Sequence, residues 1–291
     1  MFDGLRIGFI GAGRVGRALS RAFATTGMPV VAVASRSHAS AEALAAALPA
    51  CRVFAAPQAV VDSVNMVFLS VPDDAIASLA ALLRWRPGMA VVHCSGGSEL
   101  NVLAKAREAG AQVGSFHPLM MFADAKAAAA LPGCAIALEA EGALLHDLEA
   151  MVAALGAQTL RVPPGARAAY HAASHYGAAF LCVLLEQGMK ILDAAGMSGE
   201  VPRKALLSLA RGTLDTLEQT DPARAMAGVY ARGDTGTAAR HLQALDSMNP
   251  NTAALYRALA LRSVALAEEA KRIERETGDS LRNLLRTNGN Q

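Results

Sequence analysis

A glycine-rich segment follows the first apolar run of the chain. Residues 11–16 read G-A-G-R-V-G, directly after the run RIGFI at 6–10 and before an amphipathic stretch. In this context the first glycine makes a tight turn, the second lets backbone approach a phosphate, and the third lets a helix pack on a strand. The pyrophosphate of a dinucleotide would then bind at the beginning of the helix. The predicted site consists of Gly11, Ala12, Gly13, Arg14, Val15 and Gly16.

The end of the next apolar run indicates which dinucleotide is bound. A unit that binds NAD normally carries an Asp or Glu about twenty residues past the glycines, but here the chain reads Ser35-Arg36-Ser37. A carboxylate would repel the 2′-phosphate of NADP, whereas an arginine fork binds it and serine hydroxyls add donors. We therefore expect NADP(H), with a solvated surface arginine as the alternative interpretation of Arg36.

A third cofactor contact is expected where the run MVFLSV ends. Ser70, Val71 and Pro72 follow this predicted strand, and the carboxyl end of such a strand lies beside the switch point of a doubly wound sheet. Asp73 or Asp74 is expected to cap the next helix, which we favour over a catalytic pair of carboxylates.

Two further strand endings carry groups suited to proton transfer. HCSGG (93–97) contains Ser95, and SFHPLMMF (115–122) contains His117. Parallel strands end at one edge of a sheet, so both side chains are expected near the nicotinamide. A histidine titrating near neutrality can move the proton that accompanies hydride transfer. The equal alternative is a histidine that bonds to backbone in a His-Pro turn.

Histidines recur on the first long helix of the second half. His171 and His175 are four residues apart, a spacing that suits a helical metal site, but the glutamate of H-E-x-x-H is absent and no carboxylate lies nearby. We therefore expect no metal. One histidine is expected to line the substrate cleft, which makes His171 a second candidate for moving the proton.

Arg232 is the candidate for holding a substrate carboxylate. It lies in the segment YARGDTGTAARHL, where a loop becomes a helix that Asp234 or Thr235 is expected to cap. An arginine at a helix entrance can bind a carboxylate. An ion pair between Arg232 and Asp234 that fixes the loop is the equal alternative.

Composition narrows the class of protein. Of the 291 residues, 53% are hydrophobic and 18% charged, with a net charge of +2, which suits a compact, helix-rich protein. The absence of a basic block and a content of 4% aromatics argue against nucleic acid. No signal-peptide pattern and no apolar run of about 18 residues occurs, so we expect a cytoplasmic protein without a membrane partner. The four separated cysteines are expected in the core, without disulfides.

The order of the predicted elements indicates two domains. Eight apolar runs, with helical patterns between several of them, predict a mostly parallel sheet with room for antiparallel additions among its last strands. After the Pro-Pro-Gly at 163–165 only helical patterns follow, at 166–195, 200–219, 235–246 and 250–276. The prediction is an α/β Rossmann domain, doubly wound, at 1–162 and an all-helical substrate and dimerisation domain at 163–291. The strands are expected at 6–10, 29–35, 51–54, 66–71, 90–94, 112–116, 134–139 and 157–162.

These motifs together resemble a family of two-domain bacterial proteins with a Rossmann-like domain and a helical domain called DUF2520. The resemblance rests on GAGRVG, SFHPLMMF, YHAAS and ARGDTGTAARHL. The wider NADP oxidoreductase superfamily includes ketopantoate reductase, pyrroline-carboxylate reductase and prephenate dehydrogenase. The resemblance implies a helical domain like that of 6-phosphogluconate dehydrogenase and a homodimer. The chain departs from β-hydroxyacid dehydrogenases, because it has His171 and His175 in place of their Lys and Asn, and Ala178-Ala179 in place of a Ser-Asn pair.

The leading hypothesis is an NADP-dependent oxidoreductase that reduces a small carbonyl acid, a 2-keto acid such as ketopantoate, by hydride transfer. His117 or His171 would move the proton and Arg232 would bind the carboxylate. One alternative is another reaction on the same cofactor, such as imine reduction or hydride exchange with a deazaflavin. The other is a sensor or scaffold that binds NADP(H) without turnover.

Overall fold

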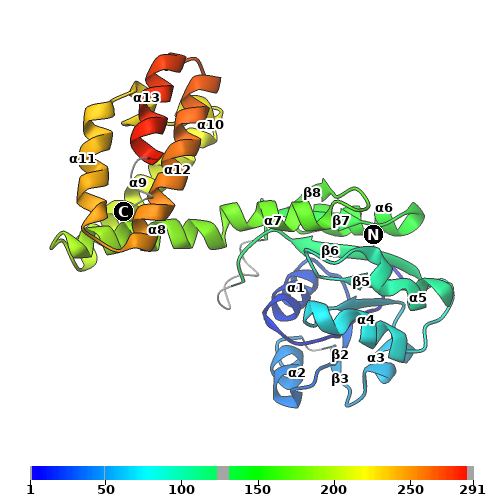
Figure 1. The fold of residues 1–291 in the computed structure, drawn as a ribbon. Coiled ribbons are helices and arrows are strands. Elements are labelled where there is room, and N and C mark those ends of the chain that lie inside the picture. The colour runs from blue at the N-terminus through cyan, green and yellow to red at the C-terminus, as the bar shows by residue number, and fades with distance from the viewer. Residues whose placement is uncertain (1, 49, 123–130, 287–291) are drawn as a thin grey trace. The chain divides into compact units, whose positions relative to one another are not determined.

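The computed structural model describes residues 2–48, 50–122 and 131–286. The chain forms two compact units, Met1–Ala178 and Ala179–Gln291 (Figure 1). The units divide after α7 (Arg167–Gly177), whereas the domain boundary predicted from the sequence lies before this helix, near residue 162.

An eight-stranded sheet forms the centre of the first unit, in the order β3-β2-β1-β4-β5-β6-β7-β8. The strands from β1 to β6 are parallel, β7 pairs with β6 in the antiparallel direction, and β8 is parallel to β7. All eight predicted strands are confirmed, as is the antiparallel addition. Their bounds are Ile7–Ile10, Val30–Ala34, Arg52–Val53, Met66–Leu69, Ala90–His93, Gln112–Pro118, Ala135–Glu139 and Gln158–Arg161.

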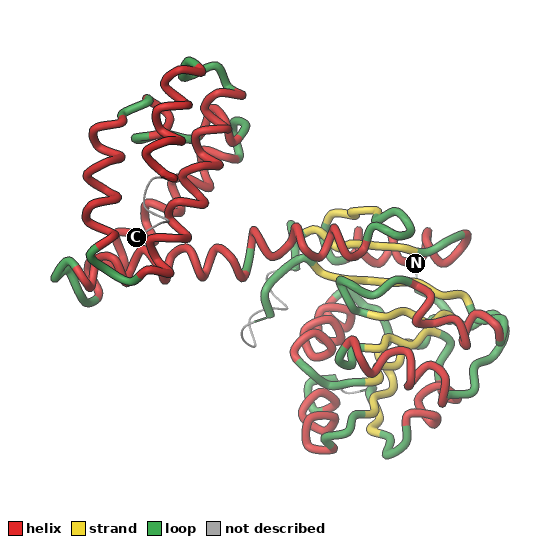
Figure 2. Tube along the Cα trace, viewed as in Figure 1, coloured by secondary structure: helices red, strands yellow, loops and turns green. Residues whose placement is uncertain are grey.

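Helices cover both faces of this sheet (Figure 2). Strand residues on one face pack in one core with α1 (Arg14–Thr25), α2 (His38–Ala45) and α6 (Gly142–Ala154). The other face packs against residues of α3, α4, η1 and α5. Strands buried on both faces require continuous apolar runs, which explains why β1, β2, β4 and β5 show no alternation of polar residues. The bounds of the second set are Pro57–Ser63, Asp73–Leu82, Leu100–Leu103 and Ala104–Glu108.

Four phenylalanines connect α1 to the strands beneath it. Phe68 stacks on Phe9 with ring centroids 5.2 Å apart and meets Phe23 of α1 edge-on at 5.1 Å. Phe116 of β6 contacts both Phe23 and Phe68 edge-on at 5.7 Å. Aromatic pairs in such geometries contribute about 0.5–1.5 kcal/mol each beyond the burial of their area. The cluster therefore packs the last turn of α1 against β1, β4 and β6.

The second unit consists of helices: α8, α9, α10, η3, α11, α12 and α13 in the described part of the chain. Its core contains Ala238, Leu242, Ala260, Val264, Leu281 and Leu285, from α11, α12 and α13. The continuous helix predicted at 166–195 is wrong, because the chain breaks at Ala178 (φ −127°, ψ −91°). The bounds are Ala179–Ala194, Glu200–Leu217, Pro222–Ala225, Tyr230–Arg232, Thr235–Asp246, Pro250–Glu269 and Arg275–Arg286.

Two expectations from composition can be compared with the described residues. Among them, no helix is both long and apolar enough to cross a membrane. The cysteines are free thiols, and Cys94 is buried, but Cys182 is exposed on α8, so the prediction that all four lie in the core is wrong for this residue.

Candidate functional site

The glycine turn is locked to the end of β4. Gly11 has a positive φ of +107°, and a Cβ there would lie 2.4 Å from the carbonyl oxygen of Ser70. A Cβ on Gly16 would lie 2.5 Å from Ser70 Oγ. The Ser70 hydroxyl donates to the Gly11 carbonyl at 2.9 Å. Ser70 thus fixes the shape of the turn, in addition to its predicted place beside the cofactor.

The beginning of α1 has the features of an anion site. Gly13, its N-cap, makes no side-chain capping bond, and the first turn contains no acidic residue. Among the described residues, no heavy atom other than those of its chain neighbours lies within 4 Å of a Cβ built on Gly13. Arg14 is exposed and Val15 half-buried. Free N–H groups at the positive end of a helix fit a pyrophosphate.

The segment Ser35-Arg36-Ser37 connects β2 to α2. Ser37 caps α2 and accepts a hydrogen bond from the Ser40 amide at 3.2 Å, which leaves its own hydroxyl proton available. Arg36 is exposed and makes no hydrogen bond or ion pair within the described part of the chain. His38 faces Glu42 at 3.3 Å, one turn along the helix. The arginine and the serine hydroxyls are therefore available to a phosphate group.

The segment after β4 differs from its prediction in one respect. Pro72 is the N-cap of α4, so the expected capping role of Asp73 or Asp74 is wrong. Asp73 instead accepts a hydrogen bond from Ser95 Oγ at 2.7 Å. Ser95 Oγ also accepts from the Ser98 amide at 3.0 Å. The Ser95 side chain thus makes a hydrogen bond within its own loop and connects this loop to α4. Val71, between β4 and α4, is half-buried.

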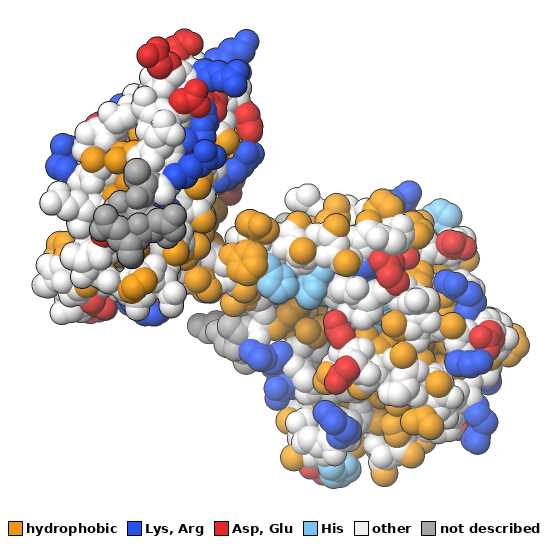
Figure 3. All heavy atoms as spheres, viewed as in Figure 1, with side chains coloured by type: hydrophobic (Ala, Val, Ile, Leu, Met, Phe, Trp, Pro, Cys, Tyr) orange, Lys and Arg blue, Asp and Glu red, His pale blue; other side chains and the backbone are white. Residues whose placement is uncertain are grey.

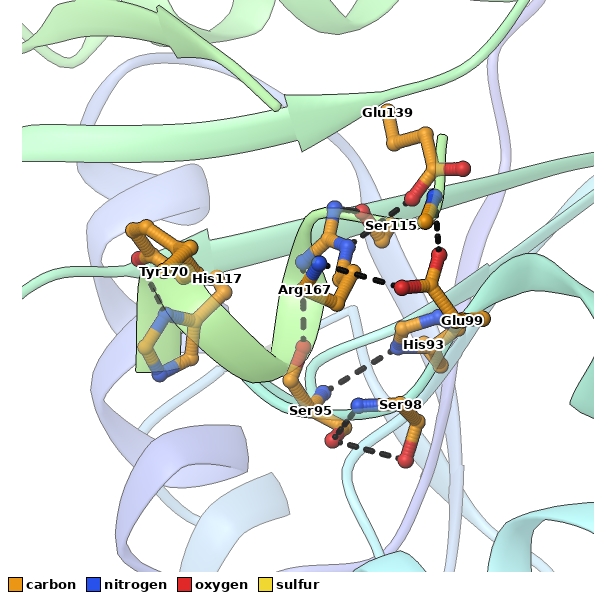
Figure 4. A network of polar contacts seen from close by, with 10 residues as sticks. His93, Ser95, Ser98, Glu99, Ser115, His117, Glu139, Arg167 and Tyr170 are labelled. Atoms are coloured by element: carbon orange, nitrogen blue, oxygen red, sulfur yellow. Dashed lines mark hydrogen bonds and ion pairs between the residues drawn. The ribbon is translucent and has the colours of Figure 1, made fainter. Parts of the chain in front are cut away.

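His117 forms a close pair with a residue that we did not single out from the sequence. Its Nδ1 lies 2.7 Å from the hydroxyl oxygen of Tyr170 on α7 (Figure 4). Burial, together with the charges of His171 and Arg167, lowers the pKa of His117 to about 4. Burial raises the pKa of Tyr170 to about 12. At neutral pH the hydrogen bond therefore joins a neutral imidazole to a protonated phenol.

A glycine pair after β5 makes room for two imidazole rings. A Cβ on Gly96 would lie 2.8 Å from His117 Cε1 and 2.9 Å from both His117 Nε2 and His171 Cδ2. A Cβ on Gly97 would lie 3.1 Å from His171 Nδ1. The two ring centroids are 6.1 Å apart. The structure therefore brings His117 and His171 together against the backbone of the loop that contains Ser95.

The third histidine of this group has a structural contact. His175 Nδ1 donates to the carbonyl oxygen of His171 at 2.8 Å, and their ring centroids are 4.8 Å apart. Figure 3 shows histidine side chains gathered on the surface of this unit. Among the described residues, no group of three or more His, Cys, Asp or Glu side chains is arranged to hold a metal ion.

A buried ion pair between Arg167 and Glu139 lies to the side of His117 (Figure 4). Arg167, 0% exposed, donates from Nε to Glu139 Oε2 at 2.9 Å. Its terminal nitrogens donate to Ser115 Oγ and to the carbonyl oxygen of Ser95. The carboxylate of Glu99 accepts from the backbone amides of Gly165 and Arg167, at 3.1 and 3.0 Å. These contacts fasten the beginning of α7 to the sheet.

Sheet register explains how the network assembles. His93 lies opposite Ser115, and Ser115 lies opposite Glu139, so three polar side chains form a row across β5, β6 and β7. Burial, with Arg167 and His117 nearby, lowers the pKa of His93 to about 3. Sequence reasoning missed Ser115, Glu139 and Arg167. The available signal was the polar residues His93, Ser115 and Glu139 in largely apolar strands, while the first residue of α7, Arg167, had no such signal.

Arg232 lies in the second unit, at the end of η3, and is exposed. Asp234 caps α11 by accepting from the Thr237 amide at 2.9 Å, as one of the two predicted caps. The described residues show no ion pair between Arg232 and Asp234. The binding of a substrate carboxylate by Arg232 stays a prediction.

Comparisons with known proteins agree with this architecture. Residues 3–118 match the model of a Rossmann-like domain, and residues 134–263 match the domain of unknown function DUF2520. No curated protein is significantly similar in sequence.

Several solved structures share the fold. A Bacteroides fragilis protein described as an NADP oxidoreductase has 22% identity and a TM-score of 0.73, over 91% of this chain and 99% of its own. A reductive aminase from Aspergillus terreus, in complex with NADPH and ethyl-5-oxohexanoate, has 17% identity and a TM-score of 0.61, over 97% and 92%. Pyrroline carboxylate reductase from Plasmodium falciparum, with NADP bound, has 13% identity and a TM-score of 0.59, over 98% and 99%. The chain thus combines a segment that matches a Rossmann-like domain with a segment that matches DUF2520, and it shares its fold with these three solved structures.

Proposed function

We propose that the protein is an NADP(H)-dependent oxidoreductase that reduces a small carbonyl acid or imine by hydride transfer. The observation that carries the proposal is the hydrogen-bonded pair of His117 and Tyr170 at the sheet edge where the glycine turn also lies. In doubly wound sheets, ligands bind outside the carboxyl ends of the strands. A bound nicotinamide would supply the hydride, and the chain would supply the proton.

The cofactor assignment rests on the glycine turn and on Arg36. The open space at Gly13 and the uncapped beginning of α1 fit a pyrophosphate. The exposed Arg36 fits the 2′-phosphate that distinguishes NADP from NAD. The presence of NADPH or NADP in two structures of the same fold supports this assignment.

Binding measurements test the cofactor assignment. We expect Arg36→Asp to weaken NADPH binding by about 1.5–3 kcal/mol, the size of a hydrogen bond to a charged group, and to change NADH binding little. Arg84→Asp, at an exposed arginine after α4, is the matched control and should leave both affinities unchanged. Titration calorimetry with the two dinucleotides measures the effect. An unchanged preference for NADPH in Arg36→Asp would show that another residue reads the phosphate.

The proton would come from His117 Nε2. Because Tyr170 keeps its proton, it can donate to Nδ1, which places the imidazole proton on Nε2. Nε2 has no hydrogen-bond partner among the described residues and lies beside Gly96. As Nε2 donates to the oxygen or nitrogen of the reacting double bond, Nδ1 takes the phenolic proton. The substrate then gains a hydride and a proton, and solvent reprotonates Tyr170.

Two substrate classes fit this chemistry. A 2-keto acid would place its carbonyl oxygen at His117 and would need a cation for its carboxylate. A cyclic or open imine would place its nitrogen at the same position. The names of two similar structures, reductive aminase and pyrroline carboxylate reductase, favour the imine class. Turnover with paired panels of 2-keto acids and imines separates the two.

We also propose that the second unit pairs with a second copy of the chain. The 16-residue helix α8 reads AFLCVLLEQGMKILDA, yet it has no buried residue in the single chain. The 18-residue α9 has none either. Hydrophobic side chains are visible over this unit in Figure 3, and Phe180, Val183 and Leu184 are 45%, 48% and 39% exposed. An exposed apolar helix of this length is typical of an interface.

Light scattering tests this assembly. We expect the wild-type chain to have the mass of a dimer and Val183→Glu to shift it toward the monomer, because a charge would be buried without a partner. Leu82→Glu is the control, since Leu82 on α4 is 81% exposed and lies in the other unit. A wild-type mass equal to that of the monomer would exclude the proposed pairing.

A further inference from the structure

Arg167 combines two features that are rarely found together: its side chain carries a full charge and is 0% exposed. A buried charge is retained only where partners replace its water. Arg167 reaches partners on three separate segments, Glu139 on β7, Ser115 on β6 and the Ser95 carbonyl after β5. One side chain thus ties together the strand ends that surround His117.

Arg167 is also the first residue of α7, the helix that carries Tyr170 and His171. Ala166, the N-cap, makes no side-chain capping bond, and Glu99 from a loop 68 residues away accepts from the Arg167 amide instead. The side chain and the backbone of Arg167 are therefore both anchored. Tyr170 lies one turn further along, and it can stay 2.7 Å from His117 Nδ1 only while this turn keeps its place.

The charge of Arg167 acts on the same pair of groups. It is one of the causes that lower the pKa of His117, after burial and His171, and it also lowers the pKa of Tyr170 against the larger effect of burial. The charge of Asp73 on α4 has the opposite effect and raises the pKa of His117. Arg167 and His117 in turn both lower the pKa of His93 on β5. A positive charge stabilises a proton donor after its proton has left, so it favours donation over uptake.

We propose that Arg167 is a positioning residue of the proton relay: it fixes the first turn of α7 so that Tyr170 meets His117, and its buried charge favours release of the proton. This inference rests on the proposed function. In this proposal, the contacts of Glu139, Ser115 and Glu99 with Arg167 position the proton relay in addition to stabilising the fold.

Titration of His117 in the full chain, by NMR with isotope-labelled histidine, tests the inference without a substrate. In the wild type we expect the pKa of His117 to be about 4. Arg167→Met should raise it toward the ordinary value of about 6.5. Arg167→Lys keeps the charge but loses the fork, so the pKa should remain low while the contact between Tyr170 and His117 weakens. Arg161→Met, at an exposed arginine paired with Glu149, is the control and should change neither.

Arg167→Met leaves Glu139 buried without a partner and can fail to fold. The double variant Arg167→Gln/Glu139→Gln removes both charges and keeps hydrogen-bonding groups, so it should fold and show the same rise in the pKa of His117. An unchanged pKa in either variant overturns the role of Arg167. If the pKa responds but the wild type turns over none of the keto acids or imines, the reductase proposal fails while the control of His117 by Arg167 stands.

Discussion

Among the individual residues, the proposed proton source consists of His117 and Tyr170, two side chains that are 53 positions apart in the chain. The sequence predicted His117, because a histidine at a strand end is a chemical signal by itself. It did not predict Tyr170 as its partner, since that pairing depends on where the first turn of α7 lies. Arg167 and Glu139 were missed because their burial follows from the antiparallel register of β6 and β7.

Replacing His117 or Tyr170 should lower kcat without changing the affinity for NADPH. We expect His117→Gln to lower kcat by about 100- to 10,000-fold, the usual contribution of a general acid. Tyr170→Phe removes the phenolic proton that Nδ1 takes during the transfer, so it should lower kcat by a similar factor. Steady-state kinetics with NADPH measures both.

Affinity for NADPH should be unchanged in both variants, since neither side chain is assigned to the cofactor. His146→Gln, at an exposed histidine on α6, is the matched control for histidine loss. Full activity in His117→Gln would remove His117 from the reaction.

At the scale of elements, the sequence was informative where a pattern is local. All eight strands and the turn at Gly11 follow from apolar runs and glycines. The break at Ala178 has one local signal, Gly177 directly before it, but the helical pattern continues on both sides of this glycine, so the sequence predicted a single helix. The helix α13 was missed because it is polar apart from the stripe formed by Leu281 and Leu285, which becomes apparent only against α11 and α12.

The loop after β5 is an element whose geometry should be sensitive to a single methyl group. In Gly96→Ala the new Cβ would lie under 3.0 Å from atoms of both His117 and His171, so the rings must shift. A misplacement of about 1 Å in a catalytic geometry can cost about 100-fold in rate. We therefore expect a large loss of kcat, measured by steady-state kinetics, with NADPH affinity kept.

Gly212→Ala provides the control for this change. Gly212 lies inside α9, and among the described residues no heavy atom outside its own helix is within 4 Å of the added Cβ. Alanine should stabilise the helix by about 0.5–1 kcal/mol and leave the rate unchanged. Equal activity of the Gly96→Ala variant and the wild type would show that the close approach of the rings is not needed for catalysis.

At the scale of the whole molecule, buried neutral histidines couple folding to pH. The folded state holds the pKa of His93 near 3 and that of His117 near 4, below the ordinary value of about 6.5. For each histidine, between its folded-state pKa and the ordinary value of about 6.5, the unfolded chain binds more protons than the folded chain. The contribution of both residues to stability is therefore complete above about pH 6.5 and is lost as the pH falls toward 4 and then 3.

Denaturant unfolding at a series of pH values tests this coupling. We expect the free energy of unfolding of the wild type to fall between about pH 6.5 and 4, at most by about 1.4 kcal/mol for each pH unit and each histidine. His117→Gln should show a shallower fall, while His146→Gln should follow the wild type. Parallel curves for His117→Gln and the wild type would contradict the assigned protonation state.

Transfer of a labelled hydride distinguishes an NADPH-dependent reductase from a protein that only binds NADPH. The full-length wild type is mixed with NADPH that carries deuterium at the transferred position of its nicotinamide, and with panels of 2-keto acids and imines. The account predicts that NADPH is consumed with at least one substrate, that deuterium appears on its former carbonyl or imine carbon, and that both signals fall in His117→Gln. NADPH that binds tightly but transfers deuterium to no member of either panel would contradict it, and would instead indicate a protein that binds NADPH without reducing these substrates.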